Sequence, residues 1–268
     1  MKHLEVDLFS HKFIIPFETD GEKDLWLNIQ SGAWEPQTLK LINFFVTKNS
    51  VALDVGGSVG ETTIFIGSKA GKTVAVDPSP FSIKCIQGII DLNFHLAGKI
   101  LLFEGALSDR DELIFFGRGS DHFSDIHFGV NRFDKYVEGI SIESLSKRVG
   151  LDFSFINIDI EGGEFRCLPA MRTYLKSHSP DLLLSLHPGF NVRSIFFRSN
   201  YFLIPKLISR IYWNLKIIRS TKSYRFCVDV SRRRVIPIWT LLSPRFLSGK
   251  NGNECQILFT NKTAFNWE

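Results

Sequence analysis

The sequence has few cysteines and lacks long apolar runs. Its four cysteines are widely spaced and form no C-x-x-C pair, which argues against a zinc site and gives no sign of a disulfide framework. No apolar run approaches the roughly 18 residues that a membrane-spanning helix needs. The N-terminal stretch MKHLEVDLF mixes charges among its apolar residues and lacks the apolar centre of a signal peptide. These absences predict a soluble protein of the reducing cytoplasm.

Apolar and aromatic residues are abundant. Hydrophobic residues make up 44% of the 268, and 25 of them are phenylalanines. That is ample material for one large core, so we expect a single α/β domain over residues 51–268, preceded by a lead-in segment over 1–50. A basic, helix-containing elaboration is expected within the domain at about 190–225.

Charge is distributed unevenly along the chain. The formal net charge is +4, but residues 193–245, which we call the basic block, hold twelve Lys and Arg against one acid, Asp229. The basic block could meet an acidic or phosphorylated substrate, an anionic membrane surface or nucleic acid, or it could pack on the acidic remainder of the chain. It lacks an RNA-binding motif and its aromatic residues follow helical spacing, which ranks nucleic acid lowest.

Short apolar strands alternate with helices along the domain. Strands are predicted at 51–54, 73–77, 100–103, 153–159, 182–187 and 256–260, and helices at 61–68, 82–92 and 165–175. This alternation predicts parallel βαβ units in a doubly wound, mostly parallel sheet with an antiparallel C-terminal strand. Right-handed crossovers place the carboxyl ends of the parallel strands at one edge, where ligands bind.

A further helix is predicted at 203–218, where apolar residues recur with helical spacing at 204, 207, 208, 211, 215 and 218. As a core helix, it would cover the sheet with this apolar face. As an interfacial helix, its cations would meet anionic lipid while Ile211, Tyr212 and Trp213 enter the headgroup region. We favour the core position.

A glycine-rich turn follows the first predicted strand. Gly56, Gly57 and Gly60 leave room for a close ligand, but Glu61 stands where a phosphate-binding P-loop would have G-K-[ST]. A dinucleotide would place its pyrophosphate at the start of the following helix, where Asp54 and Glu61 would repel it. S-adenosylmethionine carries no phosphate but has a cationic ammonium and a cationic sulfonium, so these acids favour it over the nucleotides.

Asp77 ends the second predicted strand. Its carboxylate is placed to accept hydrogen bonds from the two ribose hydroxyls of an adenosine group. Asp77 alone would fit a nicotinamide cofactor equally well. The choice of ligand therefore depends on the acids that flank the glycine turn.

Two polar side chains end later strands, Asp159 the fourth and His187 the fifth. Because imidazole exchanges protons near neutral pH, we expect His187 to be a general base, with Asp159 orienting the acceptor or acting as the base itself. Glu161, at the start of the next helix, is a third catalytic candidate, although it or Glu164 could simply cap that helix. Asp159, Glu161 and His187 could also hold a divalent metal, but their spacing does not require one and no metal is predicted.

Taken in order, these motifs resemble the FkbM family of S-adenosylmethionine-dependent methyltransferases, over roughly 34–188 and more loosely to the end. The resemblance is carried by WEP at 34–36, LDVGGSVG at 53–60, VDPS at 76–79, Asn93, GALSD at 105–109, NIDIEGGE at 157–164 and LH at 186–187. It implies a Rossmann-like class I methyltransferase fold, S-adenosyl-L-methionine as cofactor, and methyl transfer to a hydroxyl of a sugar, glycolipid or secondary metabolite. The alternatives are transfer to nitrogen or a carboxylate, and a non-catalytic module of the same fold that binds nucleic acid or a membrane surface.

The resemblance also extends the donor site. Ala106 and Ser108 would lie in the loop beside the adenine, and Glu35 would reach the amino end of the donor. The predicted donor-binding set is Glu35, Asp54, Gly56, Gly57, Ser58, Gly60, Thr63, Asp77, Pro78, Ala106 and Ser108. Where this chain has Gly57 and Ser58, alanine and asparagine are common in the family, so no side-chain amide is present there.

Overall fold

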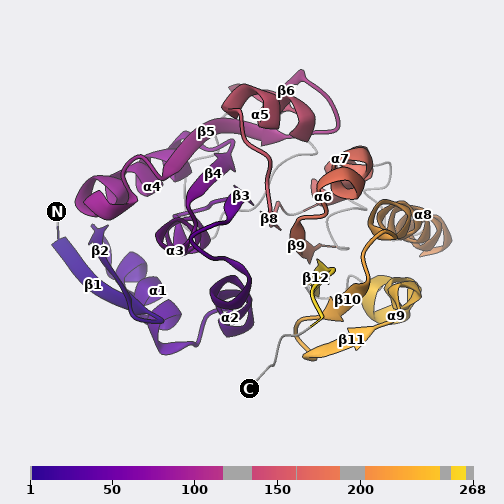
Figure 1. Cartoon of the computed structure of the whole chain (residues 1–268), viewed down its shortest axis with the longest axis horizontal. Coiled ribbons are helices and arrows are strands. Elements are labelled where there is room, and N and C mark those ends of the chain that lie inside the picture. The colour runs from indigo at the N-terminus through magenta and orange to yellow at the C-terminus, as the bar shows by residue number, and fades with distance from the viewer. Residues whose placement is uncertain (1, 117–134, 161, 188–202, 248–254, 264–268) are drawn as a thin grey trace. The chain divides into compact units, whose positions relative to one another are not determined.

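The structure is a computed structural model that describes the chain except residues 1, 117–134, 161, 188–202, 248–254 and 264–268 (Figure 1). The chain divides into two compact units. Unit 1 consists of residues 1–104 and 153–155, and unit 2 of residues 105–152 and 156–268. Strands β5 and β8 contribute residues to both units.

Unit 1 begins with an antiparallel hairpin of β1 (Lys2–Leu8) and β2 (His11–Phe17). Two helices follow, α1 (Asp20–Ser31) and α2 (Pro36–Phe45). The expected lead-in segment therefore folds into two strands and two helices. Thr19 and Glu22 start α1 with a capping box, in which each side chain accepts a hydrogen bond from the other residue's backbone N–H. Asn93 anchors the hairpin to the rest of the unit by a pair of 2.8 Å hydrogen bonds with the backbone of Ile14.

Three parallel strands form the centre of unit 1: β3 (Val51–Val55), β4 (Lys72–Asp77) and β5 (Ile100–Leu107). Helices α3 (Glu61–Lys69) and α4 (Pro80–Leu92) connect them, and the short helix η1 (Phe94–Leu96) follows α4. Strands β3 and β4 bury nearly every side chain, as expected for parallel strands covered on both faces, whereas β5 buries fewer than half of its side chains. All three predicted strands and both predicted helices are confirmed to within a few residues.

Unit 2 contains the later strands. Their order is β11-β10-β12-β9-β8, from β11 (Arg234–Ile236), β10 (Phe226–Asp229), β12 (Cys255–Thr260), β9 (Asp181–Leu186) and β8 (Phe155–Ile158). β12 is antiparallel to both of its neighbours, β9 and β10, which confirms the predicted antiparallel C-terminal strand. The end of β5 pairs in parallel with β7 (Lys135–Ile140), and β7 pairs antiparallel with β6 (Glu112–Phe116). The α/β class is confirmed.

One helical prediction in unit 2 differs from the structure. The helix expected at 165–175 is two helices, α6 (Glu164–Ala170) and α7 (Arg172–His178), separated by Met171, where ψ is −1° instead of the helical value near −42°. After β11, Pro237 ends the strand because it has no N–H to donate, and a short helix, η2 (Ile238–Leu242), follows. Helix α5 (Ile142–Val149) begins after Ser141, whose side chain accepts a hydrogen bond from the Ser144 N–H.

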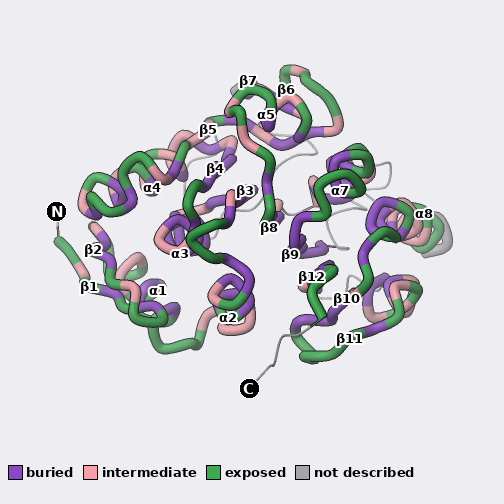
Figure 2. The backbone as a smooth tube through the Cα atoms, in the orientation of Figure 1, coloured by how far each residue is buried: buried purple, intermediate pink, exposed green. Residues whose placement is uncertain are grey.

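Helix α8 (Leu203–Thr221) is present, but its buried side coincides with the predicted apolar face only in part, at Ile218. It packs on α6, α7, η2 and α9 (Pro244–Leu247). Its buried residues include Asn214, Ile217, Ile218 and Thr221, whereas Leu207 and Ile208 of the expected apolar face are 46% and 61% exposed. Asn214 is tolerated in the interior because its amide donates 2.7 Å to the carbonyl oxygen of Leu241. Exposed residues along α8 are green in Figure 2.

Within the described residues, none of the helices combines the length and the apolar character that crossing a bilayer requires.

Candidate active site

The glycine turn of unit 1 joins β3 to α3 through three residues with left-handed backbone conformations. Their φ angles are 90° at Gly56, 49° at Ser58 and 105° at Gly60. Glycine adopts this region without strain. For a residue with a side chain, such as Ser58, the left-handed conformation costs roughly 1–2 kcal/mol of conformational free energy. The turn is fixed by a 2.9 Å hydrogen bond from the Gly56 N–H to the Val76 carbonyl oxygen on β4.

Gly57 is required for space rather than for its φ angle. A Cβ atom built there would lie 2.9 Å from Oγ1 of Thr63 and 3.0 Å from Cδ1 of Ile86. Both distances are shorter than ordinary van der Waals contact. The backbone of this turn is therefore packed closely against α3 and α4.

Asp54, on β3, is completely buried. Its Oδ2 accepts hydrogen bonds from two hydroxyls of α3, at 2.9 Å from Thr62 and 2.6 Å from Thr63. Thr63, predicted to bind the donor, is itself 0% exposed, and its hydroxyl is donated to Asp54. The two threonines bind the end of β3 to the first turn of α3.

Asp77, at the end of β4, is 6% exposed. Backbone N–H groups donate to its two oxygens, from Ser58 at 3.1 Å and from Ser79 at 2.8 Å. Burial raises the pKa of Asp77 to about 6, and the negative charge of Asp54 adds to the rise although the hydrogen bonds to Ser79 and Ser58 oppose it. Pro78 follows at the half-buried start of the next loop.

Glu61 is the first residue of α3 and is buried. Its pKa is raised to about 7, chiefly by burial and also by the charges of Asp54 and Glu35, although hydrogen bonds with the backbone and with the Ser58 side chain oppose the rise. Its Oε2 has no hydrogen-bond partner among the described residues. A buried carboxylate oxygen without a partner is rare and indicates a group that a ligand could satisfy.

Glu35 lies at the start of α2 in a left-handed conformation, with φ 34° and ψ 52°. Its Oε2 accepts a 3.0 Å hydrogen bond from the Thr38 hydroxyl. Because its charge raises the pKa of Glu61, it belongs to the same electrostatic neighbourhood. We refer to Glu35, Asp54, Glu61 and Asp77 as the unit 1 carboxylates.

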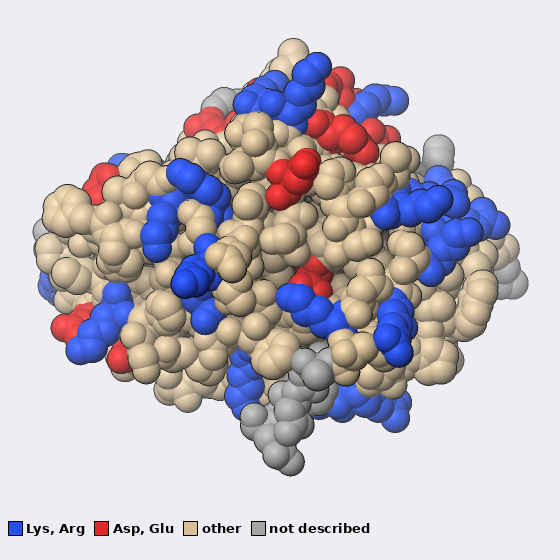
Figure 3. All heavy atoms as spheres, in the orientation of Figure 1, with Lys and Arg blue, Asp and Glu red and all other residues tan. Residues whose placement is uncertain are grey.

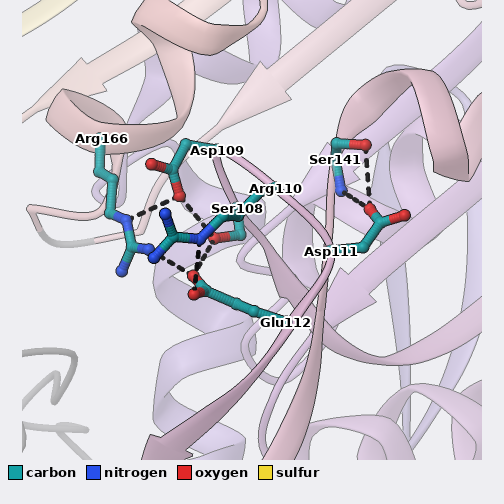
Figure 4. Close-up of polar contacts among 7 residues, drawn as sticks. All are labelled: Ser108, Asp109, Arg110, Asp111, Glu112, Ser141 and Arg166. Carbon is teal, nitrogen blue, oxygen red and sulfur yellow. Dashed lines mark hydrogen bonds and ion pairs between the residues drawn. The ribbon is translucent and has the colours of Figure 1, made fainter.

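The predicted adenine loop belongs to unit 2, but it begins later than expected, because Ala106 pairs with Gly139 of β7 inside β5. Ala106 is half-buried in the strand, and the Ser108 hydroxyl bonds Glu112 at 3.0 Å and Asp109 at 3.3 Å. Arg166 of α6 donates 2.8 Å to Asp109 and also pairs with Glu112, so this loop is held by a closed network of charges (Figure 4). The Ser108 side chain therefore has a fixed direction.

His187 and Asp159 are brought together in unit 2, with 3.5 Å between His187 Nε2 and Asp159 Oδ1. His187 is buried, and the Asp159 side chain is 32% exposed. Glu164, which is fully buried, accepts a 2.7 Å hydrogen bond from the His187 backbone N–H and lies 3.4 Å from the ring Nδ1. Its other oxygen accepts 2.6 Å from the Gly162 N–H. The imidazole thus lies between two carboxylates.

Glu161, the third catalytic candidate, lies outside the described residues. Sequence reasoning missed the part that Glu164 plays, since it treated this residue as a helix cap. Its position three residues after Glu161 could be seen in the sequence. Its contact with His187 could not, because the two residues are 23 positions apart and no local pattern connects them. The same holds for Arg166 and its partners after β5.

Comparisons with known proteins place the chain in a family. The model of the methyltransferase FkbM domain matches residues 54–205. Among solved structures, the chain is similar to methyltransferase FkbM from Methylobacillus flagellatus KT, with 13% identity and a TM-score of 0.48, over 88% of this chain and 60% of that one. It thus spans about 60% of the length of that protein. No curated protein matches.

Two other solved structures are similar at lower scores. A putative O-methyltransferase from Klebsiella pneumoniae has 9% identity and a TM-score of 0.44, with 92% of each chain covered. A TehB-like SAM-dependent methyltransferase from Corynebacterium glutamicum ATCC 13032 has 10% identity and a TM-score of 0.43, covering 91% of this chain and 97% of that one. At these scores the structural likenesses carry no argument about activity. The family match does, because it covers more than half of the sequence: this chain belongs to the FkbM methyltransferase family, with its Rossmann-like class I fold.

Proposed function

We propose that this protein transfers the methyl group of S-adenosylmethionine to a hydroxyl oxygen of a sugar, glycolipid or secondary metabolite. Methyl transfer follows from the family, and the family typically uses this donor. The observation that carries the choice of donor is the set of unit 1 carboxylates, three of which are buried, above all the orphaned Oε2 of Glu61. Neither Glu61 nor Asp77 has a Lys, Arg or His nitrogen within 4 Å among the described residues, so a cationic ligand would supply the missing charge.

The residues of unit 1 fit this donor. Its ammonium and sulfonium carry positive charge, which buried carboxylates attract more strongly than exposed ones do. Asp77 keeps acceptor capacity beyond its backbone partners, because a carboxylate has about four acceptor sites, and this capacity suits ribose hydroxyls. The turn from Gly56 to Gly60 presents backbone without side chains. A pyrophosphate would instead add negative charge beside Glu61 and Asp77.

Asp54 and Thr63 would act differently from the other predicted donor residues. Both have no exposed surface, so we propose that Asp54 acts on the donor through its charge and that Thr63 acts by positioning Asp54. Ala106, Ser108 and Pro78 remain predicted neighbours of the donor. The bound donor supplies an electrophilic methyl carbon.

The base would be supplied by unit 2. We propose that His187 Nε2 takes the proton of the acceptor hydroxyl while the oxygen gains the methyl group. The bond between this methyl group and the sulfonium would break, and its electron pair would stay on sulfur, so that S-adenosylhomocysteine leaves as a neutral thioether. The resulting imidazolium would lie between Asp159 at 3.5 Å and Glu164 at 3.4 Å, so its charge is compensated. Glu164 also holds the backbone of His187, which fixes the ring for proton transfer. Correct orientation of the reacting groups can contribute roughly 7–11 kcal/mol to such a step.

The base distinguishes the acceptor classes. A carboxylate acceptor is already ionised and needs no base, whereas a hydroxyl must lose its proton. Wild-type protein should therefore transfer a radiolabelled methyl group into cell-extract fractions and form a product that is stable to alkali. In His187→Ala the rate of this transfer should fall at least about 100-fold. His178→Ala, which changes a partly exposed histidine of α7 next to Asp152, is the matched control and should keep full activity. Full activity in His187→Ala, or an alkali-labile methyl ester, would contradict the proposal.

We also propose that the protein acts in the cytoplasm. All four cysteines are free thiols, three of them buried, as a reducing compartment would leave them. Fractionation of expressing cells should recover the protein with cytoplasmic markers. Recovery from an extracytoplasmic compartment would overturn this assignment.

A further inference from the structure

One face of α8 is apolar and exposed. Leu207, Ile208 and Tyr212 are 46%, 61% and 50% exposed. At 3.6 residues per turn, Ile208, Tyr212 and Arg219 lie within an arc of roughly 40°, and Lys222 directly follows the last residue of the helix. On the face of the molecule shown in Figure 3, Lys and Arg side chains gather over α8. An exposed apolar stripe that continues into cations is typical of helices that lie at a membrane surface.

A pocket of about 640 Å³ opens beside the cationic end of this face. It lies entirely within unit 2, between the end of α8, β10, β11, β12 and η2. Its apolar lining includes Ile218, Tyr224, Phe226, Ile236, Trp239 and Phe259. Its volume is within the range of about 300–1,000 Å³ that is usual for ligand pockets, and such a lining suits a hydrocarbon group.

The described residues in the wall of this pocket include three cations, Arg219, Lys222 and Arg225, and no acid. None of the three has a carboxylate oxygen within 4 Å among the described residues. By contrast, Arg245 and Arg232 of the basic block pair with its single acid, Asp229, at 3.2 Å and 3.9 Å. The basic block thus neutralises part of its own charge and leaves these three cations around an apolar pocket.

Aromatic side chains accompany the cations. Trp239, in the pocket wall, is 63% exposed, and Tyr212 is half exposed on α8. Lys216 Nζ lies 4.6 Å from the centre of the Tyr212 ring and 4.7 Å from that of Trp213. Exposed Trp and Tyr with Lys and Arg nearby suit the boundary between headgroups and hydrocarbon.

We propose that this part of unit 2 binds an anionic phospholipid at a membrane surface. An acyl chain would enter the apolar pocket, and the phosphate would lie on Arg219, Lys222 and Arg225. The exposed side of α8 would rest on the surrounding headgroups. The pocket favours a lipid over nucleic acid, because a polyanion would use the cations but leave the apolar lining in water. This site lies beyond the proposed methyl transfer and does not depend on it.

Vesicle flotation tests the charge requirement. The full chain should float with vesicles of phosphatidylcholine mixed equally with phosphatidylglycerol, but not with phosphatidylcholine alone. Binding should weaken at least about tenfold in the double variant Arg219→Glu and Lys222→Glu. The control Arg172→Glu and Lys176→Glu makes the same charge change on exposed residues of α7, in the same unit, and should bind as the wild type does.

Fluorescence quenching tests the pocket. Phosphatidylglycerol with brominated acyl chains should quench the tryptophan emission of the wild type, and Trp239→Phe should lose most of this quenching while still floating. Inorganic phosphate at millimolar concentration should not displace the vesicles. The proposal is overturned if the wild type does not float, if both double variants weaken equally, if quenching is unchanged in Trp239→Phe, if phosphate displaces the vesicles, or if RNA binds in place of lipid.

Discussion

Thr63 donates its hydroxyl hydrogen to Asp54 across 2.6 Å, and neither residue has any exposed surface. The bond joins the strand before the glycine turn to the helix after it. It therefore fixes the two ends of the segment in which the donor would lie. Thr62 makes a second, slightly longer bond to the same oxygen.

Thr63→Val should destabilise the protein by about 1–3 kcal/mol, because the variant keeps the shape of the side chain but removes a hydrogen bond to a buried carboxylate. Urea unfolding measures this loss. The control Thr173→Val, at an exposed position of α7, should change the free energy of unfolding by less than about 0.5 kcal/mol. An unchanged unfolding midpoint in Thr63→Val would show that Asp54 is held by other contacts.

Gly57→Ala tests the close packing of the glycine turn. The added Cβ would press on Thr63 Oγ1 and Ile86 Cδ1, so a loss of about 1–3 kcal/mol is expected. Gly88→Ala, inside α4, is the matched control. Its added Cβ would meet only Pro16, at an ordinary contact distance of 3.9 Å, so this substitution should stabilise the protein by roughly 0.5–1 kcal/mol. Equal effects of the two substitutions in thermal unfolding would contradict the packing argument.

The pKa of Glu61 makes stability depend on pH without ligand. Between its ordinary value of 4.5 and about 7, the folded protein binds more protons at this site than the unfolded chain does. The free energy of unfolding therefore falls as pH rises through this window, by an upper limit of roughly 3 kcal/mol. Asp77 adds to the fall between 3.8 and about 6.

Glu61→Gln should flatten this dependence, because the amide cannot ionise. Denaturant unfolding at pH 5 and pH 8 measures the difference directly, and Glu143→Gln on the exposed surface of α5 should leave it unchanged. If wild type and Glu61→Gln lose equal stability between the two pH values, Glu61 is not the group responsible.

Much of unit 1 could be predicted from the sequence because its signals are local. Apolar runs bounded by glycine or proline mark β3 and β4, and the acids at Asp54 and Asp77 mark their ends. The β1–β2 hairpin was missed, since it is anchored by Asn93, 79 residues from its partner Ile14. Contacts of that range leave no periodic pattern in the chain.

The misplaced face of α8 has a related cause. Periodicity counts apolar residues and would not place Asn214 inside, but the carbonyl oxygens of Leu241 and Phe246 accept its amide hydrogens there. The candidate active site was likewise predictable only in part. The residue types of His187 and Asp159, and their positions at the ends of strands, indicated a base. The hydrogen bond from the His187 N–H to Glu164 could not be predicted, because it depends on how α6 packs against the end of β9.

Calorimetric titration with S-adenosylmethionine tests the central claim, that a cationic donor is held by the unit 1 carboxylates. Near pH 6.5, binding should release protons to the buffer, because the ligand favours the ionised forms of Glu61 and Asp77. Asp77→Asn should weaken binding at least about tenfold, and the exposed control Asp91→Asn should not. Equal affinity of Asp77→Asn and wild type, or binding of a nicotinamide dinucleotide in place of S-adenosylmethionine, would contradict the account.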